Sequence, residues 1–278
     1  LMASISTNRA HLFTRKQALT YSEPQIVIPK HIQAISSGAF SNRTKIRSVQ
    51  LPEGLHSICS NAFQGCCFLE IVTMPHSVST IEKAAFAGCA RLKVVYCSNQ
   101  ITELPKECFR DDKKLEKILF TAKSKLTAIQ RSCFSNCSHL QFILLPSQVE
   151  SIGAQAFYRC KELSQVRLPA SLKAIGKEAF YFCGLKSLTL PDSLEVIEDS
   201  AFFKCSKLVE VKIPTSVKHI GKWVFHGCNS LQVVEFRHDP EFIGDWIINR
   251  AARIRCYRGS AVDAYCQKFG FTVEYLED

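Results

Sequence analysis

In the stretch Gly153–Cys183, GAQAFYRCKELSQVRLPASLKAIGKEAFYFC, one short pattern occurs twice. Phe157 follows an Ala and precedes a Cys by three residues, and Phe180, 23 residues further on, has the same neighbours. A fixed period in the twenties is typical of solenoids, because one such unit cannot bury its own apolar face and must stack on a copy of itself. The repeat therefore predicts a solenoid.

The same Phe recurs along most of the chain. The steps between successive copies are 23 residues, apart from 25 between Phe109 and Phe134 and 22 between Phe180 and Phe202. Aliphatic residues also recur five and eight residues before each Phe. The two additional residues of the long step fall in 121–125, which we interpret as a surface loop insertion that a solenoid tolerates. The repeated Phe residues are Phe40, Phe63, Phe86, Phe109, Phe134, Phe157, Phe180, Phe202 and Phe225.

Each unit reads as a short strand ended by Pro, a second extended piece and a tight helical turn around Ala-Phe. The strand at Val166–Pro169 illustrates the first part, since alternation followed by Pro is typical of a strand that stops there. Stacked units predict an α/β repeat solenoid with one curved parallel sheet and a buried ladder of Phe rings. We expect an N-terminal flank or cap over 1–23, nine units plus a partial one over 24–257, and a C-terminal cap over 258–278.

The C-terminal cap has its own boundary signals. Ser260 with Asp263 three residues later predicts the start of a helix, and Gly270 predicts its end. The residues FTVEYL that follow predict a closing strand.

The unit LPxSLxxIxxxAFxxCxxLxxVxLP, seen in Leu168–Leu190 and again in Leu190–Ile213, resembles the BspA-type leucine-rich repeat over about residues 24–257. The resemblance implies a right-handed leucine-rich-repeat solenoid. It also implies a bacterial or protozoan surface or secreted protein that binds host proteins or other cells, without catalysis. The sequence departs from the repeat at Arg43 and Asp112, where the Cys is absent.

The charge and the apolar runs limit the kinds of partner. The net charge of +10 is spread along the repeats, without the basic run that typifies a nucleic-acid arm, so we expect no nucleic-acid partner. The apolar runs are shorter than the roughly 18 residues of a membrane span. The amino end has no secretion-signal pattern and no initiator Met, so we expect a processed or trimmed terminus. The surface or secreted location follows from the resemblance alone.

The cysteines occupy repeat positions. Seven of the 14 stand three residues after a repeated Phe, where a small apolar side chain is expected inside the coil, so we predict buried free thiols. Disulfides stay open as an alternative, because neighbouring coils lie only about 5 Å apart. The spacings do not provide two C-x-x-C pairs, so no metal site is predicted. The seven are Cys66, Cys89, Cys137, Cys160, Cys183, Cys205 and Cys228.

No catalytic pattern is present. The sequence contains no GxSxG, HExxH, GxGxxG or P-loop motif, so we expect neither an enzyme nor a cofactor. His226 stands in a position that we interpret as exposed surface. Asp111 and Asp112 lie beside two lysines in one turn, which we interpret as a solvated corner and not as an acid–base pair.

A candidate binding face follows from the strand alternation. Residues eight and ten positions after each Phe point away from the core onto the concave sheet face. In units two to five they are mostly apolar, and a contiguous exposed apolar surface usually marks an interaction site. We therefore predict a protein–protein interaction or adhesion module; self-association or cover by the N-terminal segment are the alternatives. The six residues, called the sheet patch below, are Ile71, Val94, Tyr96, Leu119, Phe142 and Leu144.

A second candidate surface is basic. Three residues before the repeated Phe, several units carry Lys or Arg, which suggests a glycan or polyanion binder, with an ordinary solvated face as the alternative. These residues, called the basic edge below, are Lys83, Lys106, Arg131, Lys177 and Lys222.

Overall fold

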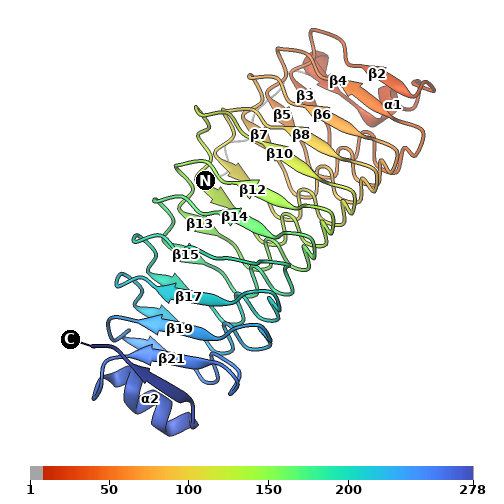
Figure 1. Cartoon of the computed structure of the whole chain (residues 1–278). Coiled ribbons are helices and arrows are strands. Elements are labelled where there is room, and N and C mark those ends of the chain that lie inside the picture. Colours follow the sequence, from red (N-terminus) through yellow and green to blue (C-terminus); the bar gives the residue numbers. More distant parts are fainter. Residues whose placement is uncertain (1–8, 278) are drawn as a thin grey trace.

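The computed structural model describes residues 9–277 as one elongated solenoid of stacked coils, with α1 and α2 at opposite ends (Figure 1). All strand pairs are parallel, which confirms the predicted leucine-rich-repeat architecture. The first strand of each unit stacks on its copies in neighbouring coils, and this row of strands, called the main ladder below, carries the sheet patch. Its members are β2 (Gln25–Val27), β4 (Ser48–Gln50), β6 (Ile71–Thr73), β8 (Val94–Tyr96), β10 (Lys117–Leu119), β12 (Phe142–Leu144), β14 (Gln165–Arg167), β17 (Glu210–Ile213), β19 (Val233–Phe236), β21 (Arg253–Cys256) and β22 (Thr272–Tyr275).

The second extended piece of each unit forms another parallel ladder, in addition to the single sheet that the sequence predicts. This ladder is interrupted between β7 and β9. In the coils that follow, the residue after each two-residue strand donates a backbone N–H hydrogen bond to a carbonyl of the preceding coil, as Gln130 N does to Leu104 O at 2.9 Å. Pro105 stands at that position after β9 and has no N–H to donate. The members are β1 (Leu12–Phe13), β3 (Ala34–Ile35), β5 (Ser57–Ile58), β7 (Thr80–Ile81), β9 (Glu103–Leu104), β11 (Ala128–Ile129), β13 (Ser151–Ile152), β15 (Ala174–Ile175), β16 (Val196–Ile197), β18 (His219–Ile220) and β20 (Phe242–Ile243).

The expected helical turns around Ala-Phe are successive tight turns. Ala39 N donates to Ser36 O at 3.1 Å within a coil, whereas Phe40 N donates to Ala62 O of the next coil at 2.7 Å. This alternation ties each turn to its neighbour. All of the residues two positions before and after the nine repeated Phe residues have positive φ, as Asn61 does at 57°.

The Phe ladder is the centre of the core. All nine predicted rings are fully buried, and neighbouring rings stack at centroid separations of 5.1–5.6 Å. Phe13 continues the stack, with its ring 5.3 Å from that of Phe40. The ladder therefore extends into the flank 1–23, which the sequence pattern alone placed outside the repeat register.

The main ladder is interrupted at the two irregular units. β10 and β12 are not paired, and the 25-residue step lies between them. β14 and β17 belong to separate sheets, and the coil between them is the 22-residue unit. Changes in repeat length therefore coincide with breaks in the sheet.

Short helices lie at both ends. Near the amino end are η1 (Arg9–His11) and α1 (Arg15–Ala18). At the carboxyl end Ser260 caps α2 (Ala261–Phe269), whose last turn ends at Gly270 with φ 68°, and β22 follows, so the predicted boundary signals are confirmed. Within residues 9–277 no helix is long and apolar enough to span a bilayer.

Candidate functional site

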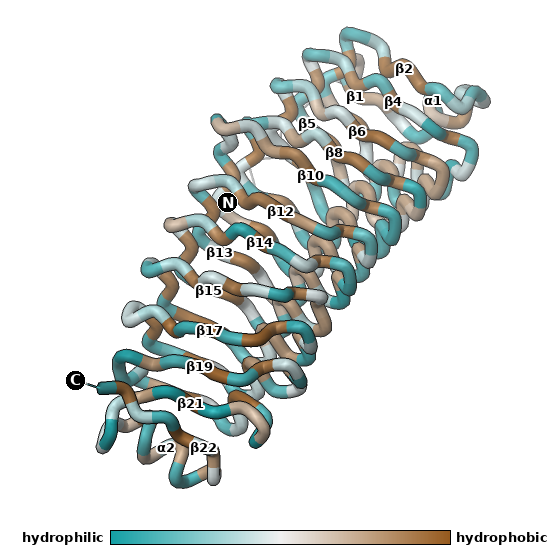
Figure 2. Tube along the Cα trace, viewed as in Figure 1, coloured by the Kyte–Doolittle hydropathy of each residue, from teal (hydrophilic) through white to brown (hydrophobic). Residues whose placement is uncertain are grey.

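The sheet patch lies on four neighbouring strands of the main ladder, β6, β8, β10 and β12. Five of its six side chains are between 42% and 51% exposed, and Val94 is half-buried. Ile71 pairs in register with Val94, and Tyr96 pairs with Leu119. In Figure 2 these strands carry mostly apolar colouring, whereas β14 shows polar residues beside its central Val.

A gap in the backbone pairing divides the patch. Within residues 9–277, β10 pairs only with β8, and β12 pairs only with β14. In adjacent coils the amide after the strand donates across to the next one, as Cys97 N does to Leu119 O at 2.9 Å and Leu145 N to Arg167 O at 3.3 Å. Within the described part of the chain, Phe120 N has no corresponding bond to Leu144 O.

The same two coils remain joined on their other sides. Phe109 N donates to Cys133 O at 2.9 Å, and the rings of Phe109 and Phe134 stack at 5.5 Å. β9 and β11 are also paired. The additional residues of 121–125 follow directly after β10, where Ser124 N closes a turn to Thr121 O at 3.1 Å. The coils thus lack backbone pairing on the sheet face only, and Cα atoms of β10 and β12 still lie within 8 Å of one another.

An open groove of about 950 Å³ runs across β10 and β12 and reaches the residues that follow β14. Leu119, Phe142 and Leu144 of the sheet patch line it. The groove is also lined by Glu116, Lys117 and Arg167, so its charged side chains comprise two cations and one carboxylate. Neither cation forms an ion pair with another residue of 9–277.

Sequence reasoning missed this groove. It predicted the exposed apolar side chains but interpreted 121–125 as a harmless surface loop, and it assigned no role to Lys117 or Arg167. The signal that could have indicated the groove was the 25-residue step itself, because an additional two residues beside a strand must displace that strand or the loop.

The basic edge is not continuous along the array. All five side chains are exposed, but Ala154 and Asp199 occupy the same repeat position and interrupt the series. Lys83 also forms an ion pair with Glu107 at 3.4 Å. These contacts do not favour a polyanion site over a solvated face.

An aromatic stripe lies one residue after the repeated Phe in later units. The rings of Tyr158, Tyr181, Phe203 and His226 stack in sequence at 4.9, 5.1 and 5.8 Å. His226 is therefore half-buried against Phe203, not simply exposed as the sequence predicted. Because each ring covers the face of the next, the stripe offers mostly ring edges, and we interpret it as an outer part of the core.

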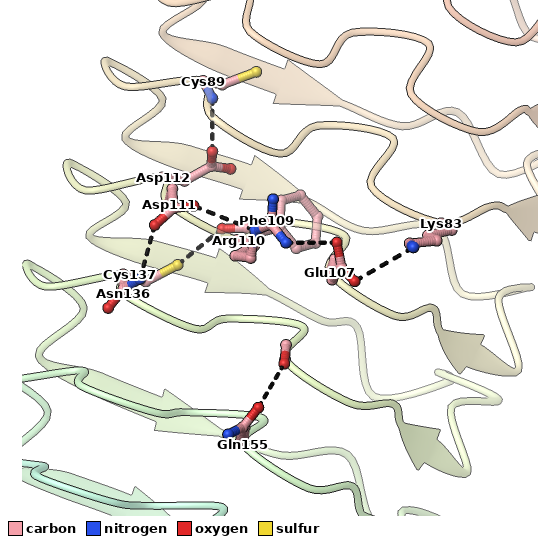
Figure 3. A network of polar contacts seen from close by, with 11 residues as sticks. Lys83, Cys89, Glu107, Phe109, Arg110, Asp111, Asp112, Asn136, Cys137 and Gln155 are labelled. Atoms are coloured by element: carbon pink, nitrogen blue, oxygen red, sulfur yellow. Dashed lines mark hydrogen bonds and ion pairs between the residues drawn. The ribbon is translucent and has the colours of Figure 1, made fainter.

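The expected solvated corner at Asp111 and Asp112 is wrong for Asp112. Its side chain is fully buried, because it takes the core position that Cys occupies in other units. Oδ1 accepts a hydrogen bond from Cys89 N at 2.7 Å, whereas the buried Oδ2 has no partner (Figure 3). Burial raises the pKa of Asp112 well above its usual range, and the nearby Asp111 carboxylate adds to the shift.

The cysteine positions have a polar as well as an apolar role. Each of the seven repeat-position thiols donates to the carbonyl of the Phe in the preceding coil, as Cys137 Sγ does to Phe109 O at 3.1 Å (Figure 3). All 14 cysteines are free in the structure, and the seven are buried, as predicted. Burial raises the pKa of the Cys66 thiol to about 12, so it carries little thiolate at neutral pH.

Among residues 9–277 no three His, Cys, Asp or Glu side chains are grouped so that they could hold a metal ion. The groove and the sheet patch are thus the features of this surface with the clearest binding chemistry, and that chemistry is apolar contact, exposed backbone and unpaired positive charge.

Comparison with known proteins gives a family-level match. The sequence model of the BspA type leucine rich repeat region matches residues 13–141 and 127–254, with six copies. No curated protein matches the chain significantly.

Several solved structures share the fold. A leucine-rich repeat protein from Bacteroides ovatus is 21% identical with a TM-score of 0.61, and the match covers 91% of this chain and 84% of that one. A leucine rich cell surface protein from Faecalibacterium prausnitzii is 23% identical with a TM-score of 0.53, covering 91% and 79%. The leucine-rich repeat protein of T. pallidum is 24% identical with a TM-score of 0.52, covering 91% and 86%.

Proposed function

This chain belongs to the BspA-type leucine-rich repeat family, and from that membership we propose that it is a non-enzymatic adhesion module that binds a protein partner through the sheet patch. Leucine-rich-repeat solenoids of this kind are protein-interaction or surface repeat modules and are typically non-enzymatic. The proposal adds the site and the kind of contact.

The observation that carries the proposal is the cluster of half-exposed apolar side chains on consecutive strands. Leu119, Phe142 and Leu144 stand on strands whose opposite faces are buried in the core, so their side chains point outward. An exposed apolar patch on an ordered surface usually marks an interaction site, and aromatic residues near its centre contribute most of the binding energy.

We further propose that the module acts at a cell surface or after secretion. The F. prausnitzii protein of the same fold is described as a cell surface protein, which supports this location for the present chain.

The double substitution Phe142→Glu with Leu144→Glu is expected to abolish partner capture, because two carboxylates would have to be desolvated within the contact. The measurement is affinity capture from cell-surface extracts with the immobilised chain, followed by mass spectrometry, with thermal unfolding as the check that the variant folds. Sedimentation of the wild-type chain tests self-association through the same patch.

Ser48→Glu with Gln50→Glu is the matched control, because these exposed residues occupy the corresponding positions on β4. Capture should survive in the control variant. Equal capture by the Phe142/Leu144 variant would refute the assignment of the patch, and a patch-dependent dimer in the absence of a captured partner would replace it with self-association.

A further inference from the structure

We propose that the groove between β10 and β12 binds an extended, acidic and apolar peptide segment of the partner, which adds to the sheet as a strand between them. This inference rests on the proposed function, because it assigns a chemical class to the ligand of that same surface.

The first argument is the backbone. The coils on either side of the gap show which backbone groups normally pair at this position. Glu116 N donates to Lys93 O at 2.9 Å and Ser164 N donates to Gln141 O at 3.0 Å. Within residues 9–277 the corresponding bond from Gln141 N to Glu116 O is not made, nor is the bond from Phe120 N to Leu144 O. Two parallel strand edges therefore face each other across the groove, and an extended peptide is a ligand whose own N–H and C=O groups match them.

The second argument is the shape of the opening. Strands in a sheet lie about 4.8 Å apart, so an intervening strand needs β10 and β12 to be about 9.6 Å apart. The coils are fixed to each other by the Phe109–Phe134 stack and by β9–β11 pairing, which lie away from the sheet face. Cα atoms of β10 and β12 lie within 8 Å of one another, so a strand can enter only if the two coils rotate apart about those contacts. The groove volume lies within the usual range for ligand sites.

The third argument is the side chains that line the groove. Leu119, Phe142 and Leu144 provide apolar contacts for alternate residues of a strand. Lys117 on β10 and Arg167 on β14 stand on opposite sides of these contacts and have no ion-pair partner within residues 9–277. An acidic side chain near each end of a short apolar segment would pair with both, which a basic segment would not.

The experiment selects peptides from a displayed library of random dodecapeptides against the immobilised full chain. The proposal expects enrichment of sequences that alternate apolar residues and carry Asp or Glu. Affinity of a synthesised selected peptide should fall at least tenfold when alternate amides are N-methylated, because strand addition uses those N–H groups. Enrichment of basic or purely polar sequences, no enrichment, or indifference to N-methylation would overturn it.

A deletion variant tests the gap itself. Removing Ser124 and Lys125 restores the 23-residue step and lets Leu126 N close the turn to Thr121 O, as Leu55 N closes to Pro52 O at 3.0 Å. We expect β10 and β12 to pair and peptide binding to fall at least tenfold, although all six residues of the sheet patch remain. Undiminished peptide binding by the folded deletion variant would contradict the proposal.

If the deletion variant does not fold, a charge-reversal variant tests the proposed peptide contact instead. Lys117→Glu with Arg167→Glu should lower the affinity for the selected acidic peptide at least tenfold. Lys45→Glu, which changes an exposed residue far along the array, should not. Equal affinity in both variants would refute the charge assignment.

The partner-capture test separates the two proposals. If the deletion variant still captures the partner but the Phe142→Glu/Leu144→Glu variant does not, the proposed patch stands and the proposed strand addition is refuted. If both variants still capture the partner, both proposals are refuted.

Discussion

Replacing Phe157 with Ala is expected to lower the free energy of unfolding by about 3–5 kcal/mol, the usual range for truncating a buried Phe. Its ring is fully buried and stacks on Phe134 at 5.2 Å and on Phe180 at 5.1 Å. The cavity would therefore remove contacts from three coils at once. Because each coil is stabilised mainly by its neighbours, the loss should spread along the array.

Urea unfolding followed by circular dichroism measures this effect. Phe142→Ala is the matched control, since that ring is about half exposed on the sheet face and should contribute well under 1 kcal/mol to stability. A Phe157→Ala variant as stable as the control would contradict the description of the Phe ladder as the core.

Replacing Asp112 with Cys is expected to raise the free energy of unfolding by about 2–3 kcal/mol at pH 8, because it removes a buried carboxyl with one unpaired oxygen. The new thiol would occupy the position from which thiols of other coils, such as Cys89, donate to a Phe carbonyl of the preceding coil. The repeat pattern, which has Cys at this position, and the cost of burying the carboxyl therefore both favour Asp112→Cys.

The pH dependence identifies the cause. The pKa of Asp112 in the folded chain is raised above its unfolded value of about 3.9, so the folded state keeps its proton where the unfolded state has lost it. The contribution of Asp112 to stability is thus fully present below about pH 4 and is lost as pH rises toward the folded pKa. Thermal or urea unfolding from pH 4 to 9 should show a gain for Asp112→Cys that grows with pH. Asp192→Asn, at an exposed turn, should show none, and a pH-independent gain would assign the effect to packing alone.

Much of this fold is predictable from the sequence because its period is set by buried residues. The positions of Phe157 and Phe180, the aliphatic residues before them and the Cys after them repeat because each packs against its own copy in the next coil. The exposed apolar positions of β6, β8, β10 and β12 follow from the same register, since residues on either side of a buried strand residue face outward.

The remaining features depend on departures from the repeat, whose effects are not local. Pro105 interrupts the second ladder only because a particular amide is missing there, and the insertion at 121–125 opens the main ladder because the coils stay fixed elsewhere. Asp112 looked solvated beside charged neighbours, yet its repeat position is inside the coil. For Asp112 the repeat position, and not the residue type, decides the environment.

The central claim is that β10 and β12 are unpaired on the sheet face and that a partner strand enters between them. Amide hydrogen exchange of the full chain, with and without a selected peptide, tests it most directly. The account predicts fast exchange of the Phe120 and Gln141 amides in the free chain, slow exchange of the corresponding Cys97 and Glu116 amides, and protection of Phe120 and Gln141 in the complex. Slow exchange at Phe120 and Gln141 in the free chain, or protection confined to the aromatic stripe around Tyr181, would contradict it.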